Sequence, residues 1–151
     1  TIFLIERLIK QKKILTNNEF IYLSNIKINL NGKQKEEINQ IVNVINKEGI
    51  VSLNHVFIIN GEAISPLKLT SIFSLLEQQQ KIIKLNDFII NYDKVNNIRK
   101  IILNHFTNHG SLSIIEFKDL TNLSRKYSVP LLEYFDKIKF TYRTGNERKL
   151  V

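Results

Sequence analysis

Cysteine is missing from this chain of 151 residues, and only two prolines and five glycines occur in it. A chain without cysteine has no disulfide framework and no zinc site built from thiolates, so nothing in it indicates an oxidising compartment. No apolar run approaches the roughly 20 residues that span a membrane. Residues 1–7 lack the layout of a signal peptide and resemble the cut end of a helix. We therefore expect a cytoplasmic protein without a membrane partner.

Residues suited to catalysis or metal binding are also scarce. His105 and His109 are four positions apart, a spacing that can hold a metal on a helix, but the segment between them lacks the glutamate of a zinc hydrolase and no third ligand is evident. The acids of this region lie at helical spacings that suit caps and surface pairs: Glu116, Asp119, Glu133 and Asp136. The sequence predicts no catalytic residue, no metal site and no cofactor.

The net charge of +8 is distributed unevenly along the chain. Residues 1–29 have five basic and two acidic side chains, residues 30–94 have seven of each, and residues 95–151 have ten basic side chains against five acidic ones. A basic excess confined to one region is typical of proteins that bind polyanions such as nucleic acids. This distribution predicts a neutral spacer followed by a polyanion-binding module.

A helix followed by a hairpin is expected three times. Residues 13–21 contain an apolar pair, an asparagine turn and a second apolar pair, and the same order recurs in residues 81–89. Each segment follows an apolar-periodic helix and reads as two strands joined at Asn17-Asn18 or Asn86-Asp87. A third hairpin closes at Thr144-Gly145-Asn146. Three such endings indicate tandem units, the first of them truncated.

Helices with one apolar face are expected around these hairpins. Their ends carry the usual signals: Ser65 precedes a proline, Ser113 has Glu116 three residues on in a capping box, and Gly49 stops a helix. Ser124 is the expected cap of a further helix that leads into the third hairpin. The other expected helical ranges are 3–11, 32–47, 66–80, 95–109 and 114–122.

This order of three helices and a hairpin, with a helix-turn-helix inside it, is that of a winged-helix domain. The sequence therefore predicts a mainly α-helical α+β protein with small β-hairpins, built from tandem winged-helix domains. We expect the end of one such domain in residues 1–29. A neutral domain is expected in residues 30–94, the middle module, and a basic one in residues 95–151, the basic module.

The last helix and hairpin present one cationic, partly aromatic surface. Positive charge provides affinity for phosphates, while flat side chains and hydrogen-bond donors select exposed bases. The two elements are therefore predicted to act as a recognition helix and a wing. Pro130 lies inside that helix, where its missing N–H and its ring are expected to bend the chain.

Four stretches of the basic module resemble a known family, namely residues 115–120, 123–127, 130–137 and 140–148. In this order they closely resemble the terminal winged-helix domain of SelB, the bacterial selenocysteine-specific elongation factor. The residues before them are similar to the family mainly in architecture, as the end of its second winged-helix domain and its whole third one.

The resemblance implies a role in translation. In this family a GTPase part carries selenocysteyl-tRNA, and the carboxy-terminal winged helices reach an mRNA hairpin, the SECIS element, beside the UGA codon to be recoded. The implied partners are an mRNA stem-loop and, through the rest of such a protein, the ribosome and selenocysteyl-tRNA; a monomer is expected. The chain has no Gly-x-x-x-x-Gly-Lys-Ser/Thr loop, so it is not expected to bind or hydrolyse GTP alone or to be an enzyme.

The expected RNA-binding residues follow from the shape of RNA, in which phosphates and unpaired loop bases are more accessible than paired bases. Lysines and arginines are assigned to phosphates, and Tyr127 or Tyr142 to a base, although Tyr127 is about as well suited to packing against the hairpin. Arg148 and Lys149 alternate along a strand, so one of them can simply be solvated. The full set is Lys118, Ser124, Arg125, Lys126, Tyr127, Tyr142, Arg143, Asn146, Arg148 and Lys149.

Two departures from the family pattern affect this set. The family often has Arg-Arg where this chain has Tyr142-Arg143, and often arginine in place of Lys118. A lysine keeps the charge but not the bidentate geometry of arginine. The contact expected at Tyr142 therefore differs in chemistry from the family pattern.

Two other functions remain open from the residues alone. A DNA-binding winged-helix regulator would place the same helix in a major groove and would dimerise on a palindromic site. A protein-docking winged helix would expose an apolar patch with little charge bias, which fits the middle module better than the basic one. Salt-dependent binding to an RNA hairpin but not to duplex DNA separates these alternatives.

Overall fold

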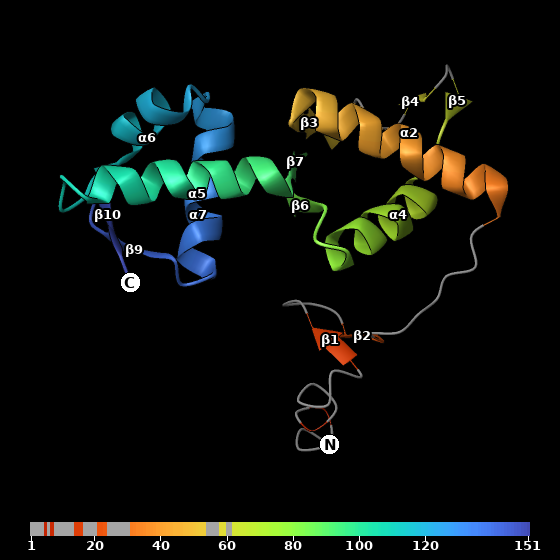
Figure 1. Ribbon diagram of the computed structural model, residues 1–151, viewed down its shortest axis with the longest axis horizontal. Helices are drawn as coiled ribbons and strands as arrows, with labels where there is room; N and C mark the ends of the chain where they lie inside the picture. Colours follow the sequence, from red (N-terminus) through yellow and green to blue (C-terminus); the bar gives the residue numbers. More distant parts are fainter. Residues whose placement is uncertain are drawn as a thin grey trace. The chain divides into compact units, whose positions relative to one another are not determined.

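The structure is a computed structural model that describes residues 31–53, 58–59 and 62–151, together with short pieces at 5, 7, 14–16 and 21–23. Contacts between residues divide the chain into two units, Thr1–Lys35 and Glu36–Val151, and each is considered by itself. The order of helices and strands can be followed along the colours of Figure 1. None of the helices among the described residues combines the length and apolar character needed to cross a membrane.

The first unit contains the hairpin that the sequence repeat predicts. Strands β1 (Ile14–Thr16) and β2 (Ile21–Leu23) are antiparallel, with Leu15 opposite Tyr22. The expected helix over residues 3–11 and the turn at Asn17-Asn18 lie outside the residues that can be described in full.

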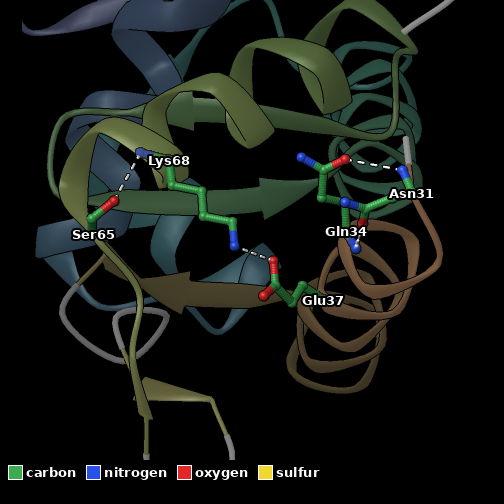
Figure 2. A network of polar contacts seen from close by, with 5 residues as sticks. All are labelled: Asn31, Gln34, Glu37, Ser65 and Lys68. Carbon is green, nitrogen blue, oxygen red and sulfur yellow. Dashed lines mark hydrogen bonds and ion pairs between the residues drawn. The ribbon is translucent and has the colours of Figure 1, made fainter. Parts of the chain in front are cut away.

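Helix α2 (Gly32–Glu48) begins at a reciprocal cap. The Asn31 N–H donates to Gln34 Oε1 at 3.0 Å and the Gln34 N–H donates to Asn31 Oδ1 at 2.8 Å, so that two backbone donors at the helix start are satisfied (Figure 2). The expected apolar face is buried through Ile38, Ile41 and Ile45. The helix ends at Gly49, whose φ of +74° favours glycine.

Helix α4 (Pro66–Gln78) starts at Ser65, as expected, and ends slightly earlier than the predicted residue 80. The Ser65 hydroxyl accepts the Lys68 N–H at 3.4 Å, a long bond that contributes little. The Lys68 ammonium forms an ion pair with the Glu37 carboxylate, which connects α4 to α2 (Figure 2). Between these helices lie the short strands β3 (Ile50–Ser52), β4 (Ile58–Ile59) and β5 (Glu62–Ala63).

The second predicted hairpin consists of β6 (Ile82–Leu85) and β7 (Phe88–Asn91), with Asn86 in the left-handed region at its turn. The third consists of β9 (Thr141–Thr144) and β10 (Glu147–Leu150). The second and third hairpins each gain a third strand that the sequence patterns did not indicate. β3 pairs with β7, and β8 (Leu112–Ser113) pairs with β10, giving the sheet orders β3-β7-β6 and β8-β10-β9.

Helix α5 (Tyr92–Phe106) starts and ends three residues before the predicted range of 95–109. Its start is fixed by Asn91, whose side chain accepts the N–H groups of Asp93 and Lys94 at 2.7 and 3.3 Å. His109 therefore lies beyond the helix, where it stacks on His105 with ring centroids 4.3 Å apart. The sequence pattern missed the cap because an asparagine at the end of a strand reads as part of that strand.

Helices α6 (Ile114–Thr121) and α7 (Arg125–Lys137) complete a helix-turn-helix. The predicted capping box of α6 is present, and α7 continues as one helix through Pro130. The architecture is thus mainly α-helical with small antiparallel sheets, as predicted for winged helices.

One core cluster joins residues from both expected modules. Phe88 and Ile90 of β7 are buried together with apolar side chains of α5, α6 and α7. The N–H of Asn91 donates to Gly49 O at 2.9 Å, and its side-chain amide donates to Asn46 Oδ1 at 2.5 Å. The expected boundary between residues 94 and 95 therefore crosses a continuous core. The division of the chain into a neutral and a basic module remains a prediction.

Candidate nucleic-acid interface

The start of helix α7 presents two exposed cations. The chain turns sharply at Asn122, which has a φ of +53°, and then enters α7 at Arg125 and Lys126. Both cationic side chains are exposed. The turn between α6 and α7 thus places positive charge beside the free backbone N–H groups of a helix start.

Ser124 lies at the N-cap position of α7, but its side chain makes no capping hydrogen bond. Its carbonyl accepts the N–H groups of Tyr127 and Ser128 at 3.0 Å, and the hydroxyl of Ser128 also donates to it at 3.0 Å. The expected side-chain cap is therefore wrong, although Ser124 does occupy the N-cap position. The exposed Ser124 hydroxyl is not used as a cap.

The charge at the start of α7 is opposite to what a helix start prefers. The N-terminal end of a helix carries partial positive charge, so acids stabilise it and cations destabilise it. Helices α5 and α6 follow this rule with Asp93 and Glu116, whereas α2, α4 and α7 have no acid in the first turn. Of these three, α2 and α4 have a side-chain cap, while α7 has none and begins with Arg125 and Lys126. A bound anion would remove this repulsion and interact with the same N–H groups.

Tyr127 is half-buried and does not lie free on the surface. Its ring meets the Phe88 ring edge-on, with centroids 4.9 Å apart and an interplanar angle of 82°. Lys126 Nζ lies 5.9 Å from the Tyr127 ring centroid. Of the two roles considered for Tyr127, packing is the one with a partner in this structure, although that partner belongs to β7 and not to the third hairpin.

The wing has an outer face on which Tyr142 and Lys149 lie directly opposite each other. Both are exposed, and Tyr142 keeps 47% of its surface accessible. Residues opposite one another in an antiparallel pair point to the same side of the sheet. The ring and the ammonium group therefore form a single flat, cationic surface.

The tip of the wing carries a positioned arginine. Arg143 Nε donates to Gly145 O at 2.9 Å, a bond that holds the side chain over the turn while using only one of the guanidinium donors. Gly145 has a φ of +62°, and Asn146 beside it is exposed. Arg143 and Asn146 can therefore act together at the tip.

Arg148 does not belong to this exposed surface, contrary to the expectation from sequence. It is only 6% exposed, and its Nε lies 3.2 Å from Asp136 Oδ2 in an ion pair. Strand alternation directs Arg148 inward beside Leu112 and Lys149 outward. Asp136 therefore pairs with a buried residue of the wing, whereas the sequence predicted a helix cap or a surface pair for it.

The structure brings some of the expected residues together and leaves others apart. Tyr142 and Lys149 form one pair, and Lys126 lies beside Tyr127. Lys118 is half-buried in the last turn of α6. Among the described residues, no hydrogen bond, ion pair or ring contact joins the start of α7 directly to the wing.

Two titratable groups in this module have shifted pKa values. Hydrogen bonds from the Ser113 hydroxyl and from its backbone N–H hold the pKa of Glu116 below the ordinary value of 4.5. Burial raises the pKa of Tyr134, which packs against Phe135. Both groups have structural partners that account for these shifts. In the described part of the chain, no three metal-ligating side chains gather at one place.

Comparison with known proteins finds relatives that share part of this chain. A family model for the winged helix of elongation factor SelB matches residues 104–150, which include α6, α7 and the wing. The selenocysteine-specific elongation factor of Desulfomicrobium baculatum is 25% identical over 149 residues, covering 98% of this chain and 24% of that protein. The same factor of Escherichia coli K12 is 44% identical over 41 residues, covering 27% of this chain and 7% of that protein.

Two solved structures share the fold. A crystal structure of the bacterial selenocysteine-specific elongation factor EF-Sec aligns with a TM-score of 0.61 and 24% identity, covering 99% of this chain and 23% of that one. The mRNA-binding domain of SelB from Escherichia coli, solved in complex with SECIS RNA, aligns with a TM-score of 0.64 and 24% identity, covering 76% of this chain and 97% of that one. The chain thus spans about a quarter of its longer relatives, and its residues 104–150 are similar to the winged helix of elongation factor SelB.

Proposed function

We propose that this chain binds an mRNA stem-loop, and that the basic module makes the main contacts. The observation that carries the proposal is the first turn of α7, where Arg125 and Lys126 are exposed beside an unused Ser124 hydroxyl and no acid is present. Such a start is unfavourable for an isolated helix and becomes favourable when a phosphate binds there. The related SelB domain that was solved with SECIS RNA supports RNA as the polyanion.

The proposed contacts divide into phosphate binding and base reading. Cations at the start of α7 and at the tip of the wing fix the register of the RNA through its phosphates. The exposed face of Tyr142 and Lys149 provides a ring on which an unpaired loop base can stack. Lys118 and Asn146 are assigned to the edges of this surface, and Tyr127 to support of the helix start.

The middle module is proposed to act as a spacer that orients the basic module. Its equal numbers of basic and acidic side chains give it little attraction for phosphates. Its strand β7 contributes Phe88 and Ile90 to the core beneath α5, α6 and α7. A neutral module packed in this way supports the binding surface without adding to its charge.

The wider role follows from the family. In a complete factor of this kind, the winged helices would hold the mRNA hairpin while other parts of the protein engage GTP, selenocysteyl-tRNA and the ribosome. This chain lacks the sequence of a phosphate-binding loop, so we assign it RNA binding without catalysis or a cofactor. We infer a cytoplasmic location and a monomeric state from this role.

The test is to titrate the chain with an RNA hairpin of SECIS type and with duplex DNA of the same stem sequence at several salt concentrations. We expect the RNA hairpin to bind more tightly than the duplex DNA. The logarithm of the affinity should fall as the logarithm of the salt concentration rises, with a slope of about 0.9 per phosphate contact. A preference for the duplex DNA would instead support a transcription regulator. If the chain binds neither nucleic acid, the result would support a protein-docking module.

A further inference from the structure

Three polar side chains connect the wing to the end of the recognition helix. Asp136, in the last turn of α7, accepts a hydrogen bond from the Thr141 hydroxyl at 2.6 Å through Oδ1 and one from Arg148 Nε at 3.2 Å through Oδ2. Thr141 is fully buried and Arg148 is 6% exposed. These three residues, the helix–wing bracket, attach both strands of the wing to a single carboxylate.

The other three-stranded sheet allows a direct comparison. Gln80 after α4 and Lys139 after α7 both have positive φ angles, of 55° and 60°, and each is followed by a residue whose N–H bonds to the carbonyl five positions earlier. The two helix-to-hairpin connections therefore have the same geometry. Residues of β6 and β7 can be matched with those of β9 and β10 from this point.

The corresponding positions in the β6–β7 hairpin are mostly apolar. Ile82 and Ile89 stand where the basic module has Thr141 and Arg148, and both isoleucines are at most 3% exposed. Glu77 stands in place of Asp136, and its carboxylate accepts the backbone N–H of Lys84 at 3.0 Å. Apolar packing is therefore sufficient to attach a hairpin to a helix in this fold, so the bracket is not required for attachment alone.

Buried polar groups and apolar groups differ in what they specify. Burying a charged pair costs solvation free energy, which its attraction often only offsets, whereas apolar burial is favourable but not directional. Hydrogen bonds to the two oxygens of one carboxylate restrict both distance and angle. The distinctive effect of the bracket is thus geometric.

We propose that Asp136 is a positioning residue that fixes the angle between the wing and α7 for RNA binding. It would set the distance between the cations that begin α7 and the Tyr142–Lys149 face, so that phosphates and a loop base are met at once. This inference rests on the proposed RNA-binding function. It assigns Arg148 a structural partner inside the protein in place of a phosphate.

A charge argument makes the proposal testable against a simple electrostatic effect. Changing Asp136→Asn removes one negative charge, so nonspecific attraction of RNA should increase. Loss of positioning should instead weaken binding. The two accounts therefore predict opposite signs for the same variant.

The first experiment compares Asp136→Asn with Glu133→Gln in RNA-hairpin titrations of the full chain. Glu133 lies on the same helix and is exposed, and its change of charge is identical. We expect Asp136→Asn to bind about tenfold more weakly, the loss corresponding to one charge-assisted hydrogen bond, and Glu133→Gln to bind at least as tightly as the parent. Equal affinities for the two folded variants would overturn the proposal.

The second experiment measures the wing angle without RNA. Because the chain has no cysteine of its own, cysteines introduced at the exposed residues Lys137 and Glu147 are the only sites at which spin labels attach. The distance distribution between them should be narrow in the parent and broader in Asp136→Asn. A distribution as narrow as that of the parent contradicts the proposal, whether or not the chain binds RNA.

An apolar replacement keeps the test valid if Asp136→Asn folds poorly. The variant Asp136→Asn/Thr141→Ile/Arg148→Ile copies the apolar positions of the β6–β7 hairpin. It should retain cooperative unfolding but show a broad distance distribution and weak hairpin binding. A folded variant with parental distances and affinity would refute the positioning role, while failure of the parent to bind any hairpin would count against the proposed function alone.

Discussion

The hairpins β6–β7 and β9–β10 have the same connections but different surroundings. In β7, the consecutive residues Phe88, Ile89 and Ile90 are all buried, so both faces of that strand are covered. In β9 only Thr141 is buried, and the next three residues are exposed. One hairpin is therefore enclosed by protein, and the other keeps an open face.

The difference shows how one topology can serve two tasks. Phe88 and Ile90 belong to the core cluster of α5, α6 and α7, while Ile89 points to the opposite side of the strand. A strand covered on both faces has no side chains left for a ligand, and here it contributes to the core shared with α5, α6 and α7. The open face of β9–β10 leaves Tyr142 and Lys149 accessible for the proposed contact with RNA, in agreement with the basic excess of its module.

The largest effect is expected from breaking the shared core. Phe88→Ala should lower the free energy of unfolding by about 3–5 kcal/mol, because it removes a fully buried ring and leaves a cavity. Hydrogen exchange should show lower protection of the backbone amides in both β6–β7 and α5–α7. Phe73→Ala, in α4 and outside this cluster, is the matched control. Unchanged protection of α5–α7 in Phe88→Ala would mean that the modules are independent.

A second prediction compares the charges of the two modules. The triple variant Arg125→Ala/Lys126→Ala/Arg143→Ala should weaken hairpin binding roughly a hundredfold, at about 1 kcal/mol per cation that binds a phosphate. Its salt slope should fall by about one for each phosphate that the variant no longer binds. Filter binding at several salt concentrations provides both quantities.

The matched control for these charges lies in the middle module. Lys47→Ala/Lys81→Ala/Lys84→Ala removes the same number of exposed cations and should change the affinity by no more than about twofold, since exposed charges that bind no phosphate are screened by salt. An equal loss of affinity in the two triple variants would show that the middle module also binds RNA.

The two tyrosines should separate base reading from packing. Tyr142→Ala should reduce discrimination between loop sequences by roughly 1–3 kcal/mol, the range of base–aromatic stacking, with little change in stability because the residue is 47% exposed. Tyr127→Ala should instead lower stability, because its ring packs on Phe88. Tyr142→Phe, which keeps the ring, should bind like the parent. Affinities for a set of loop variants, with thermal unfolding as the folding control, measure both effects.

The smallest effect concerns the capping box of α6. Because the Ser113 hydrogen bonds lower the pKa of Glu116 in the folded chain, the charged carboxylate stabilises the fold above its ordinary pKa of 4.5, and this contribution is lost as the pH falls through the lower folded value. Ser113→Ala should cost about 1 kcal/mol at neutral pH and less in acid. Urea unfolding at about pH 7 and about pH 3 tests the sign. A cost that grows in acid would contradict it.

Much of the fold could be predicted because its signals are local. The capping box at Ser113, the glycine stop at Gly49 and the hairpin turns each act over a few residues, and the structure confirms all of them among the described residues. The start of α5 was missed because its local signal is ambiguous. Asn91 is both the end of β7 and the cap of the helix, and a local pattern assigns it to only one of these.

The candidate site was less predictable than the fold. The exposed positions of Arg125, Lys126 and Tyr142 agree with the surface that was expected from charge and residue type. The inward position of Arg148 disagrees with that expectation. From sequence, a basic residue beside another basic residue on a hairpin is expected to contact a phosphate. An acid at the end of the preceding helix is the only sequence signal for its partner, and Asp136 resembles any surface acid there.

By itself, the sequence determined the order of the helices in residues 32–137, where the two described hairpin turns lie and which part of the chain carries excess positive charge. Only the tertiary structure decided which face of each hairpin is covered. It paired β3 and β8 with the hairpins, placed Phe88 beneath α7, and turned Arg148 toward Asp136. Caps and turns depend on neighbours within a few residues, whereas burial depends on segments that are distant in the chain and meet only when it folds.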